Sequence, residues 1–362
     1  MPLLSGAWDG RAAPRLTIVG TTAWNGLGAS AYQTWAFRRA ELTAFAETPF
    51  RGPSGARLTM AHIRSMPPRT PCADRMGAIV NRLLTELLTP VARDLGGARI
   101  GLSLGLPERM SPDVRDKRQQ KQKRDVEAEA KRAIERLGME AVVEGIPRGN
   151  AAFAFGALQV GHALASGALE VAVLGGVDSY YDPGVLESLG EQERLFEGEN
   201  LDGFIPGEGG ALMLVARHDV ARRMRWPALG HLTGAAVNDE IGHSFSDIPC
   251  MGLGLSRAAI AATEPLRATK SALDWWMSDM TPETYRVHEF QLAWPRAASD
   301  IMSPQSTLEH LPTYLGDLGA ATMPTGVAIA LEGMKRRAPI ASAALVTGTS
   351  WGVDRGAVLV TG

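Results

Sequence analysis

The segment GNAAFAFGALQVGHALASGALEVAVLGG, residues Gly149–Gly176, decides how this chain folds. It contains a turn of small residues, an apolar helix and a short apolar strand that ends in paired glycines. A helix that is apolar on all sides is buried on all sides, so the segment predicts a helix at the centre of an α/β protein. A turn that opens such a helix is a typical place for a catalytic nucleophile. No Cys, Ser, Thr or Lys lies at this turn, and Phe153 stands where the nucleophile is expected.

The composition is that of an ordinary globular protein. The chain has 362 residues, of which 45% are hydrophobic and 21% charged, and its formal net charge is −2. This balance gives no field that would attract nucleic acid or an anionic membrane surface. The cysteines, Cys72 and Cys250, are far apart and lack metal-ligand spacing, so we expect no disulfide and no bound metal. No apolar run approaches the length of about 20 residues of a membrane helix. We expect a cytoplasmic protein without a cofactor.

Short apolar strands alternate with helical patterns along the chain, which is typical of an α/β fold. We expect two central sheets, with strands near Leu16–Val19, Ile100–Leu104, Val171–Leu174, Leu345–Val346 and Val358–Val360. Two apolar helices, Phe153–Ser166 and Thr325–Leu331, should lie between these sheets. The segments AVLGGVDS…GEGGALMLVA and ALVTGTSWGVDRGAVLV share an outline of strand, glycine turn and strand, which indicates an internal duplication. We expect its halves to be residues 1–222 and 223–362.

The segment Ser111–Gly138 is rich in charge, basic at first and then mixed, with a weak apolar stripe. The simpler interpretation is a solvated helix and loop that ends at Gly138. The alternative is a docking patch for an acidic partner, formed by Arg115, Lys117, Arg118, Lys121, Lys123 and Arg124.

The order of motifs resembles a known family. The segment GALQVGHALASGALEVAVLGGVDS, followed by LDGFIPGEGGALMLV, is similar to the β-ketoacyl-[acyl carrier protein] synthases of the thiolase superfamily. That family has a nucleophile helix, a strand ending in Gly-Gly-x-(Glu/Asp) and an Asp-Gly-Phe-x-x-Gly-Glu-Gly motif in this order. LTIVGTTAWNGLG, YLGDLGAATMPTGVAIAL and the terminal SWGVDRGAVLV also resemble family segments, so the resemblance covers nearly the whole chain.

The resemblance implies a thiolase-like, duplicated, five-layered α/β/α/β/α fold and a dimer about a two-fold axis. Strands of the first half often build that interface, so we expect Glu170–Gly175 to be an edge strand that pairs with a second subunit. In the family, a cysteine at a helix N-terminus attacks an acyl thioester, two histidines stabilise the enolate that malonyl thioester forms, and backbone N–H groups form an oxyanion hole.

Those catalytic groups are missing from the matching positions. Aligning the central helix places Phe153 at the cysteine, and a phenyl ring has no lone pair with which to attack. The first histidine falls on or next to Leu292, where His288 is the only nearby imidazole. The second histidine corresponds to Asp317, and the lysine before it corresponds to Pro312. A carboxylate would repel a developing enolate. The sequence therefore predicts that condensation does not occur, and we identify no catalytic residue.

Two hypotheses for the function follow. The first is a β-ketoacyl synthase-like protein without condensing activity in fatty-acid or polyketide-type metabolism. It would bind an acyl chain, an acyl carrier protein or an active synthase subunit. Chain-length-factor subunits of the superfamily likewise lack the cysteine and pair with an active synthase. Its candidate pocket residues are Phe153, Phe155, Phe204, His288 and Trp351. The alternative is an active 3-oxoacyl-carrier-protein synthase-type acyltransferase or a thioester hydrolase whose working residues have moved, with His288, Asp317 and Cys250 available.

Overall fold

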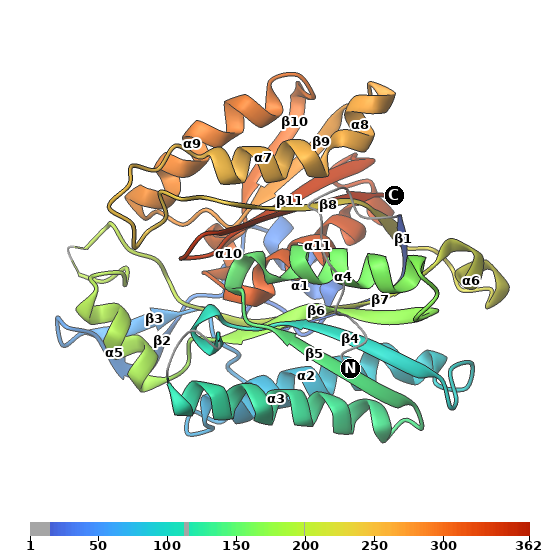
Figure 1. Ribbon diagram of the computed structural model, residues 1–362. Coiled ribbons are helices and arrows are strands. Elements are labelled where there is room, and N and C mark those ends of the chain that lie inside the picture. Colours follow the sequence, from blue (N-terminus) through green and yellow to red (C-terminus); the bar gives the residue numbers. More distant parts are fainter. Residues whose placement is uncertain (1–14, 112–115, 199) are drawn as a thin grey trace.

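The structure of the protein is a computed structural model that describes residues 15–111, 116–198 and 200–362. In this part of the chain, ten strands form one sheet with the order β10-β9-β11-β12-β8-β1-β7-β6-β4-β5, and β2 pairs with β3 in a small separate hairpin (Figure 1). The strands are β1 (Leu16–Asn25), β2 (Ala46–Arg51), β3 (Arg57–Met60), β4 (Arg99–Gly105), β5 (Glu140–Ile146), β6 (Val171–Ser179), β7 (Glu208–Ala216), β8 (Gly230–Asp239), β9 (Leu273–Ser278), β10 (Met302–His310), β11 (Ala343–Thr349) and β12 (Asp354–Thr361).

Helices form three layers around this sheet. They are α1 (Ala31–Arg39), α2 (Cys72–Leu88), α3 (Lys117–Glu135), α4 (Ala152–Ala165), α5 (Pro183–Glu191), α6 (His218–Arg223), α7 (Leu253–Ala262), α8 (Glu264–Thr269), α9 (Thr284–Ala298), α10 (Pro312–Leu315) and α11 (Thr322–Arg336). Helices α2 and α3 cover one outer face, α7 and α9 cover the other, and α4 and α11 lie in the middle (Figure 1). The five-layered thiolase-like arrangement expected from the sequence is therefore present.

The strand order shows the duplication directly. In the first half, β1 is followed across the sheet by β7, β6, β4 and β5; in the second half, β8 is followed by β12, β11, β9 and β10. If the five strands of each half are numbered 1 to 5 along the chain, both halves arrange them across the sheet in the order 1-5-4-2-3. In both, the first two pairings are antiparallel and the last two are parallel. The boundary expected at residues 222 and 223 lies at the end of α6 and stays a prediction.

The expectation of two separate sheets is wrong, because backbone hydrogen bonds join the strands of both halves into one sheet. Strand β1 pairs with β7 along most of its length, but its first three residues, Leu16–Ile18, also pair with Gly230–Leu232 of β8. This short ladder joins the halves into one continuous sheet. The five layers are still present, because the single sheet folds around the central helices. Helix α4 contacts β4 and β6 on one side and β8 and β12 on the other.

The expected edge strand is also wrong. Strand β6, which contains Glu170–Gly175 except for its first residue, pairs with β4 on one side and β7 on the other, so it lies inside the sheet. All nine of its residues are buried. The strand at this edge is β5, which pairs only with β4 among the described strands. Strand order cannot be read from apolar composition, because an interior strand and an edge strand of a covered sheet can be equally apolar.

The two central helices begin in the same way. A short 3-10 turn precedes each, Gly149–Ala151 before α4 and Gly319–Ala321 before α11. The first glycine of both turns has a φ of 53°, a left-handed conformation that favours glycine. A Cβ on Gly319 would also lie 2.0 Å from an oxygen of Asp178. The apolar sequence of both helices is explained by their burial, which supplies most of the central core.

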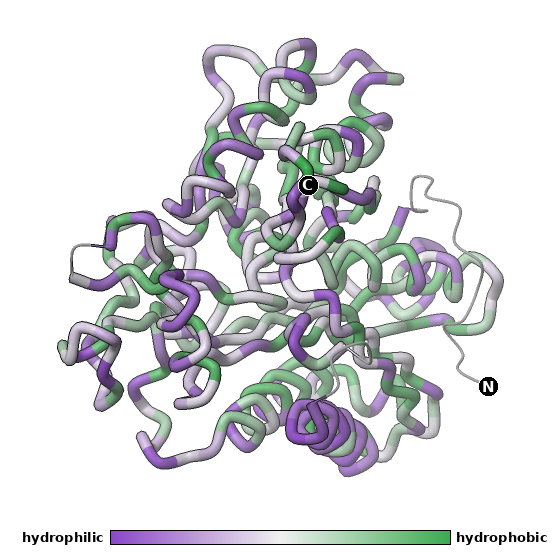
Figure 2. The backbone as a smooth tube through the Cα atoms, turned by 60° about the vertical axis from the view of Figure 1, so that its left-hand side comes forward, coloured by the Kyte–Doolittle hydropathy of each residue, from purple (hydrophilic) through white to green (hydrophobic). Residues whose placement is uncertain are grey.

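Helix α3 corresponds to the charge-rich segment. Its stripe residues Val126, Ala130, Ala133 and Ile134 are buried against the core formed with α2, and its other faces are strongly hydrophilic, as Figure 2 shows on the lower side of the molecule. Gly138, with a φ of 80°, follows the helix and ends it. Among the described residues, no helix combines the length and apolar character needed to cross a membrane.

Candidate functional site

The turn before α4 carries a polar side chain that the sequence interpretation passed over. Asn150 is 2% exposed, and its Nδ2 donates to Oδ2 of Asp279 at 2.9 Å and to Oδ1 of Asp317 at 3.2 Å. Asp279 follows the end of β9, and Asp317 follows α10 just before the turn that opens α11. We call Asn150, Asp279 and Asp317 the buried polar triad. It lies at the N-terminus of the central helix, where the fold brings both halves together.

Both carboxylates are well supplied with donors. Asp279 accepts from the backbone N–H of Thr349 at 2.7 Å, from the Thr349 hydroxyl at 3.1 Å and from Nη1 of Arg286 at 3.2 Å. Asp317 accepts from the backbone N–H of Gly319 at 2.8 Å and from the Tyr180 hydroxyl at 3.4 Å. Buried carboxylates that are held this way act as junctions between segments.

Burial raises the pKa of Asp317 to about 6, and the neighbouring charge of Asp279 adds to the rise, while Arg286 and the Gly319 N–H oppose it. The carboxyl is therefore largely ionised at neutral pH, but less completely than an ordinary aspartate. Two carboxylates separated by a single amide are repulsive, and this geometry does not favour a further negative charge beside them.

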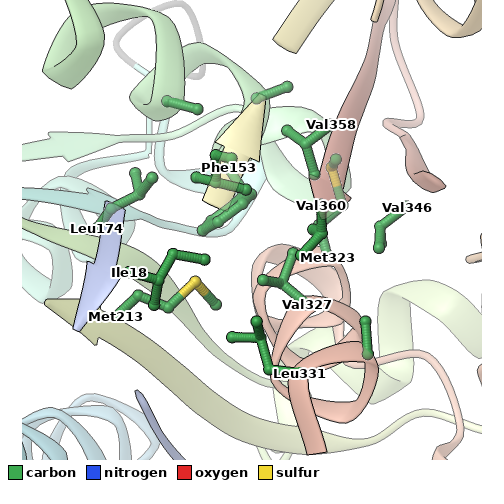
Figure 3. Close-up of a cluster of buried hydrophobic side chains, with 14 of the residues drawn as sticks. Ile18, Phe153, Leu174, Met213, Met323, Val327, Leu331, Val346, Val358 and Val360 are labelled. Carbon is green, nitrogen blue, oxygen red and sulfur yellow. The ribbon is translucent and has the colours of Figure 1, made fainter. Parts of the chain in front are cut away.

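Phe153 lies on the first turn of α4 and is fully buried. Its ring belongs to the core that α4 shares with α11 and with both halves of the sheet, among residues that include Ile18, Met213, Met323 and Val358 (Figure 3). The side chain is therefore an apolar packing group. It is not among the residues that line the hollows described below.

Little space remains beside the buried polar triad. The hollow lined by Asn150, Tyr180 and Trp351 has a volume of about 10 Å³, barely enough for one water molecule. The backbone N–H groups of Trp351 and Gly352, in the C-terminal turn, donate to the Glu108 carboxylate at 2.8 and 2.9 Å. The backbone donors of this turn are thus occupied by a side chain of the protein itself.

A larger hollow lies on the other side of Phe204. Its volume is about 420 Å³ and its lining is mostly apolar, with His310 and two threonines as polar groups; it includes Phe45, Phe196, Phe204, Ile205, Met280 and Pro312. Phe204 also belongs to an aromatic cluster with Tyr180 and Trp351, at ring separations of 5.6 and 6.5 Å. Two of the predicted pocket residues, Phe204 and Trp351, thus come together around the Tyr180 side chain.

The other predicted site residues are dispersed. His288 is exposed on α9, and Leu292, one turn further along α9, is half-buried beside Gly252. Phe155 is half-buried under the Arg148 guanidinium, 5.1 Å from its ring centre. Cys250 is buried before α7 and contacts the Tyr285 hydroxyl. Of the three family positions assigned from the sequence, only Asp317 lies in the buried polar triad.

The basic residues of the charge-rich segment are partly neutralised. Arg118 pairs with Asp182 at 2.5 Å, and Lys121 pairs with Asp125 at 2.8 Å. Lys117 and Arg124 are exposed on the same helix, α3. Arg115 lies outside the described residues. The Lys121–Asp125 pair is exposed on both sides and contributes little to stability. Arg118 is itself exposed, although its partner Asp182 is buried.

Sequence reasoning missed Asn150 and Asp279. Asn150 lies only three residues before Phe153. It could have been recognised as a candidate site residue because it is the polar residue of an otherwise apolar turn. Asp279 follows LDWWMS, a strand that contains two tryptophans and ends at Ser278. A carboxylate directly after a buried strand is a recognisable signal, because site residues gather at the carboxyl ends of strands in α/β sheets.

No protein-family model and no curated protein matches the chain. A chain of AntDE:AntF, a type II polyketide synthase acyl-carrier protein in complex with its ketosynthase, matches with a TM-score of 0.80 at 13% identity, over 98% of this chain and 99% of that one. The ishigamide ketosynthase/chain length factor matches with a TM-score of 0.78 at 13% identity, over 97% and 99%. A ketosynthase from module 6 of the Bacillus subtilis 168 bacillaene synthase matches with a TM-score of 0.76 at 14% identity, over 96% and 72%. The chain therefore has the ketosynthase, thiolase-like fold, and the expected resemblance is confirmed at that level.

Proposed function

We propose that this protein is a ketosynthase-like subunit without condensing activity, which acts by binding an acyl carrier protein or an active synthase subunit in polyketide-type or fatty-acid metabolism. The observation that carries the proposal is the buried polar triad at the N-terminus of α4, beside which the hollow lined by Asn150, Tyr180 and Trp351 has a volume of about 10 Å³. A hollow of this volume holds about one water molecule and leaves little room for a thioester.

The chemistry of the triad supports the same conclusion. We infer that Asn150, rather than Phe153, occupies the place of the family's cysteine. We also infer that Asp279, rather than Leu292, occupies the place of the first histidine, and that Asp317 occupies the place of the second. An amide nitrogen is no nucleophile, and ionised carboxylates offer no hydrogen to an enolate oxygen. The arrangement retains hydrogen bonds between the two halves and lacks every group that condensation requires.

The names of the solved structures support a binding role by analogy. One neighbour is a ketosynthase/chain length factor, and another is an acyl-carrier protein in complex with its ketosynthase. By analogy, a carrier protein would dock on this chain, with Lys117 and Arg124 of α3 as candidate contacts. A second subunit, either a copy of this chain or a related synthase, would pair along the open edge of β5.

The alternative of an active acyltransferase or hydrolase with relocated residues has less support. Its available groups were His288, Asp317 and Cys250. In the part of the chain that the structure describes, His288 lies on α9, Asp317 follows α10 and Cys250 lies in the loop before α7, and no hydrogen bond joins them. A nucleophile needs a base within hydrogen-bond reach, and this set does not supply one.

Intact-mass measurement tests the proposal. The purified protein is incubated with acyl thioesters and with malonyl-loaded carrier protein, beside an active ketosynthase as the positive control. We expect acylation and turnover for the control only, together with a complex of this chain with the carrier protein or the ketosynthase in native mass spectra. A stoichiometric acyl adduct on this chain, mapped to a described residue, would overturn the proposal in favour of the relocated-site alternative.

A further inference from the structure

A second buried cluster of polar side chains lies apart from the buried polar triad. It consists of Glu240, directly after β8, Cys250, in the loop before α7, and Glu289, on α9. One oxygen from each carboxylate and the Cys250 Sγ all lie within 4.8 Å of one another. Their exposed fractions are 3%, 9% and 1%. Two acids and a thiol thus converge in the interior from three separate elements.

One oxygen of this cluster has no partner. The Nε of Arg355 donates to Oε1 of Glu289 at 2.5 Å, whereas Oε2 of Glu289 is buried and accepts no hydrogen bond from the described residues. Glu240 accepts from the backbone N–H of Gly254 at 2.8 Å. Leaving a buried carboxylate oxygen without a donor or a cation is costly, so the geometry calls for a further group at this position.

The charges of the cluster are also unbalanced. Arg355 pairs with Glu289, and its other guanidinium nitrogens donate to backbone carbonyls and, at 2.7 Å, to the Tyr285 hydroxyl. Among the described residues, Glu240 forms no salt bridge. The charge of Arg286 also acts on Glu289, whereas Glu240 has no cation of the described residues in contact, and a buried carboxylate without one is strongly unfavourable.

We propose that Glu240, Cys250 and Glu289 bind a divalent transition-metal cation, for which Zn²⁺ is the best match. One thiolate and two carboxylates are ligands that Zn²⁺ accepts, at about 2.3 Å for sulfur and 2.0–2.2 Å for oxygen. Ligand atoms around such an ion lie roughly 3.5 Å apart, so side-chain shifts of about 1 Å close the cluster. Binding displaces the thiol proton of Cys250 to solvent, and Arg355 orients Glu289 from behind.

The site would act as a clamp. It would tie the end of β8 and the loop before α7 to α9, on the outer face of the second half, far along the chain from the turn of α4. Local spacing could not reveal it, because the three ligands are separated by 10 and 39 residues of sequence. The absence of clustered cysteines, which led to the expectation of no metal, says nothing about ligands that meet only after folding.

Cobalt binding tests the proposal. The full-length reduced protein is stripped with a chelator and titrated with Co²⁺, and thiolate-to-cobalt charge-transfer absorption is recorded in the near ultraviolet. We expect this absorption to saturate at one equivalent in the wild type, to vanish on addition of Zn²⁺ and to be absent in Cys250→Ser. Cys72→Ser is the matched control, since Cys72 is the other buried free cysteine, and it should retain the signal.

Glu289→Gln provides a second variant if Cys250→Ser folds poorly. It keeps the shape and an oxygen for Arg355, and it should weaken Co²⁺ binding at least tenfold while far-ultraviolet circular dichroism stays unchanged. No charge-transfer band in the wild type, or a band that persists in Cys250→Ser, would overturn the metal site. Because none of these readouts involves acyl transfer or a carrier protein, the outcome is independent of the proposed function.

Discussion

Asn150 uses its side-chain nitrogen to hold two carboxylates, Asp279 at 2.9 Å and Asp317 at 3.2 Å. An amide nitrogen has two hydrogens, so both are occupied. Each acid comes from the second half of the chain, whereas Asn150 comes from the first. At the scale of single residues, the triad therefore joins the two halves by hydrogen bonds. We expect substitutions in it to change the free energy of unfolding rather than an enzymatic rate.

Asp317→Asn tests how the negative charge of the Asp317 carboxylate affects the stability of the protein. Burial raises the pKa of Asp317 from 3.8 to about 6. Between those values the folded state binds more protons than the unfolded state, so the ionised carboxyl destabilises the fold at neutral pH and this penalty fades as the pH falls through about 6. Asparagine has the shape of the protonated acid. We expect the variant to be at least as stable as the wild type at neutral pH.

Urea denaturation over a pH range measures this effect. The wild type should gain free energy of unfolding from Asp317 as the pH falls from about 7 to about 5, and Asp317→Asn should lose that part of the slope. Asp247→Asn, at an exposed position, is the control and should follow the wild type. Parallel pH profiles for the wild type and Asp317→Asn would show that this carboxyl is not the source.

Phe153→Cys separates packing from chemistry. The ring is fully buried, so its loss leaves a cavity and should lower the free energy of unfolding by about 2–4 kcal/mol. Condensation should stay absent, because Asp279 and Asp317 cannot stabilise an enolate; at most, slow self-acylation of the new thiol is expected. Phe37→Cys, on the partly exposed side of α1, is the control for an unspecific thiol. Turnover close to that of an active ketosynthase would refute the inferred roles of the triad.

At the scale of elements, the two edges of the sheet differ. Strand β10 contains Pro304 and exposed polar residues, features that discourage further pairing. Strand β5 carries Val142 and Val143, both half-buried, and has no proline. The β5 edge is therefore the better candidate for pairing with a second subunit.

Val142→Lys tests the β5 edge. A charged side chain beside the unpaired backbone should oppose strand addition, so we expect association to weaken at least tenfold. Gln305→Lys places the same charge on the opposite edge, in β10, and should leave association unchanged. Light scattering over a range of concentrations, alone and with a related ketosynthase, gives the masses. A wild type that stays monomeric in both cases would contradict pairing at this edge.

At the scale of the whole molecule, the halves share their central helices. Helix α4 belongs to the first half but contacts β8 and β12, and α11 belongs to the second half but contacts β1, β6 and β7. Neither half can bury its central helix alone. The molecule should therefore unfold as a single cooperative unit despite its duplicated plan.

The free thiols allow this to be measured, since Cys72 lies in the first half and Cys250 in the second, and both are buried. Pulsed thiol labelling of the chelator-treated protein in increasing urea, with peptide mapping, reports the exposure of each thiol separately. We expect coincident midpoints, which also agree with tryptophan fluorescence. Midpoints that differ beyond error would show that the halves unfold independently.

The sequence could predict what depends on local pattern. Apolar runs located the strands, and uniform apolarity located α4 and α11 at the centre. Asp317 could be identified because the segment YLGDLGAA has the glycines and small residues that surround the second histidine in the family it resembles. Asp279, which we infer to stand at the place of the first histidine, was missed because the segment after β9 lacks a comparable frame. Strand order is a property of the assembled sheet, which explains why β6 was mistaken for an edge.

The position of α4 has a consequence for synthesis of the chain. The ribosome completes α4 at Ala165 and does not finish β12 until Thr361, about 200 residues later. At 5–20 residues per second this interval lasts roughly 10–40 s. Until β8 is complete at Asp239, the side of α4 that will face β8 and β12 has neither strand to cover it, and until β12 is complete it has only β8. The emerging first half is thus a natural client for chaperones that bind apolar helices, until the last strand leaves the exit tunnel.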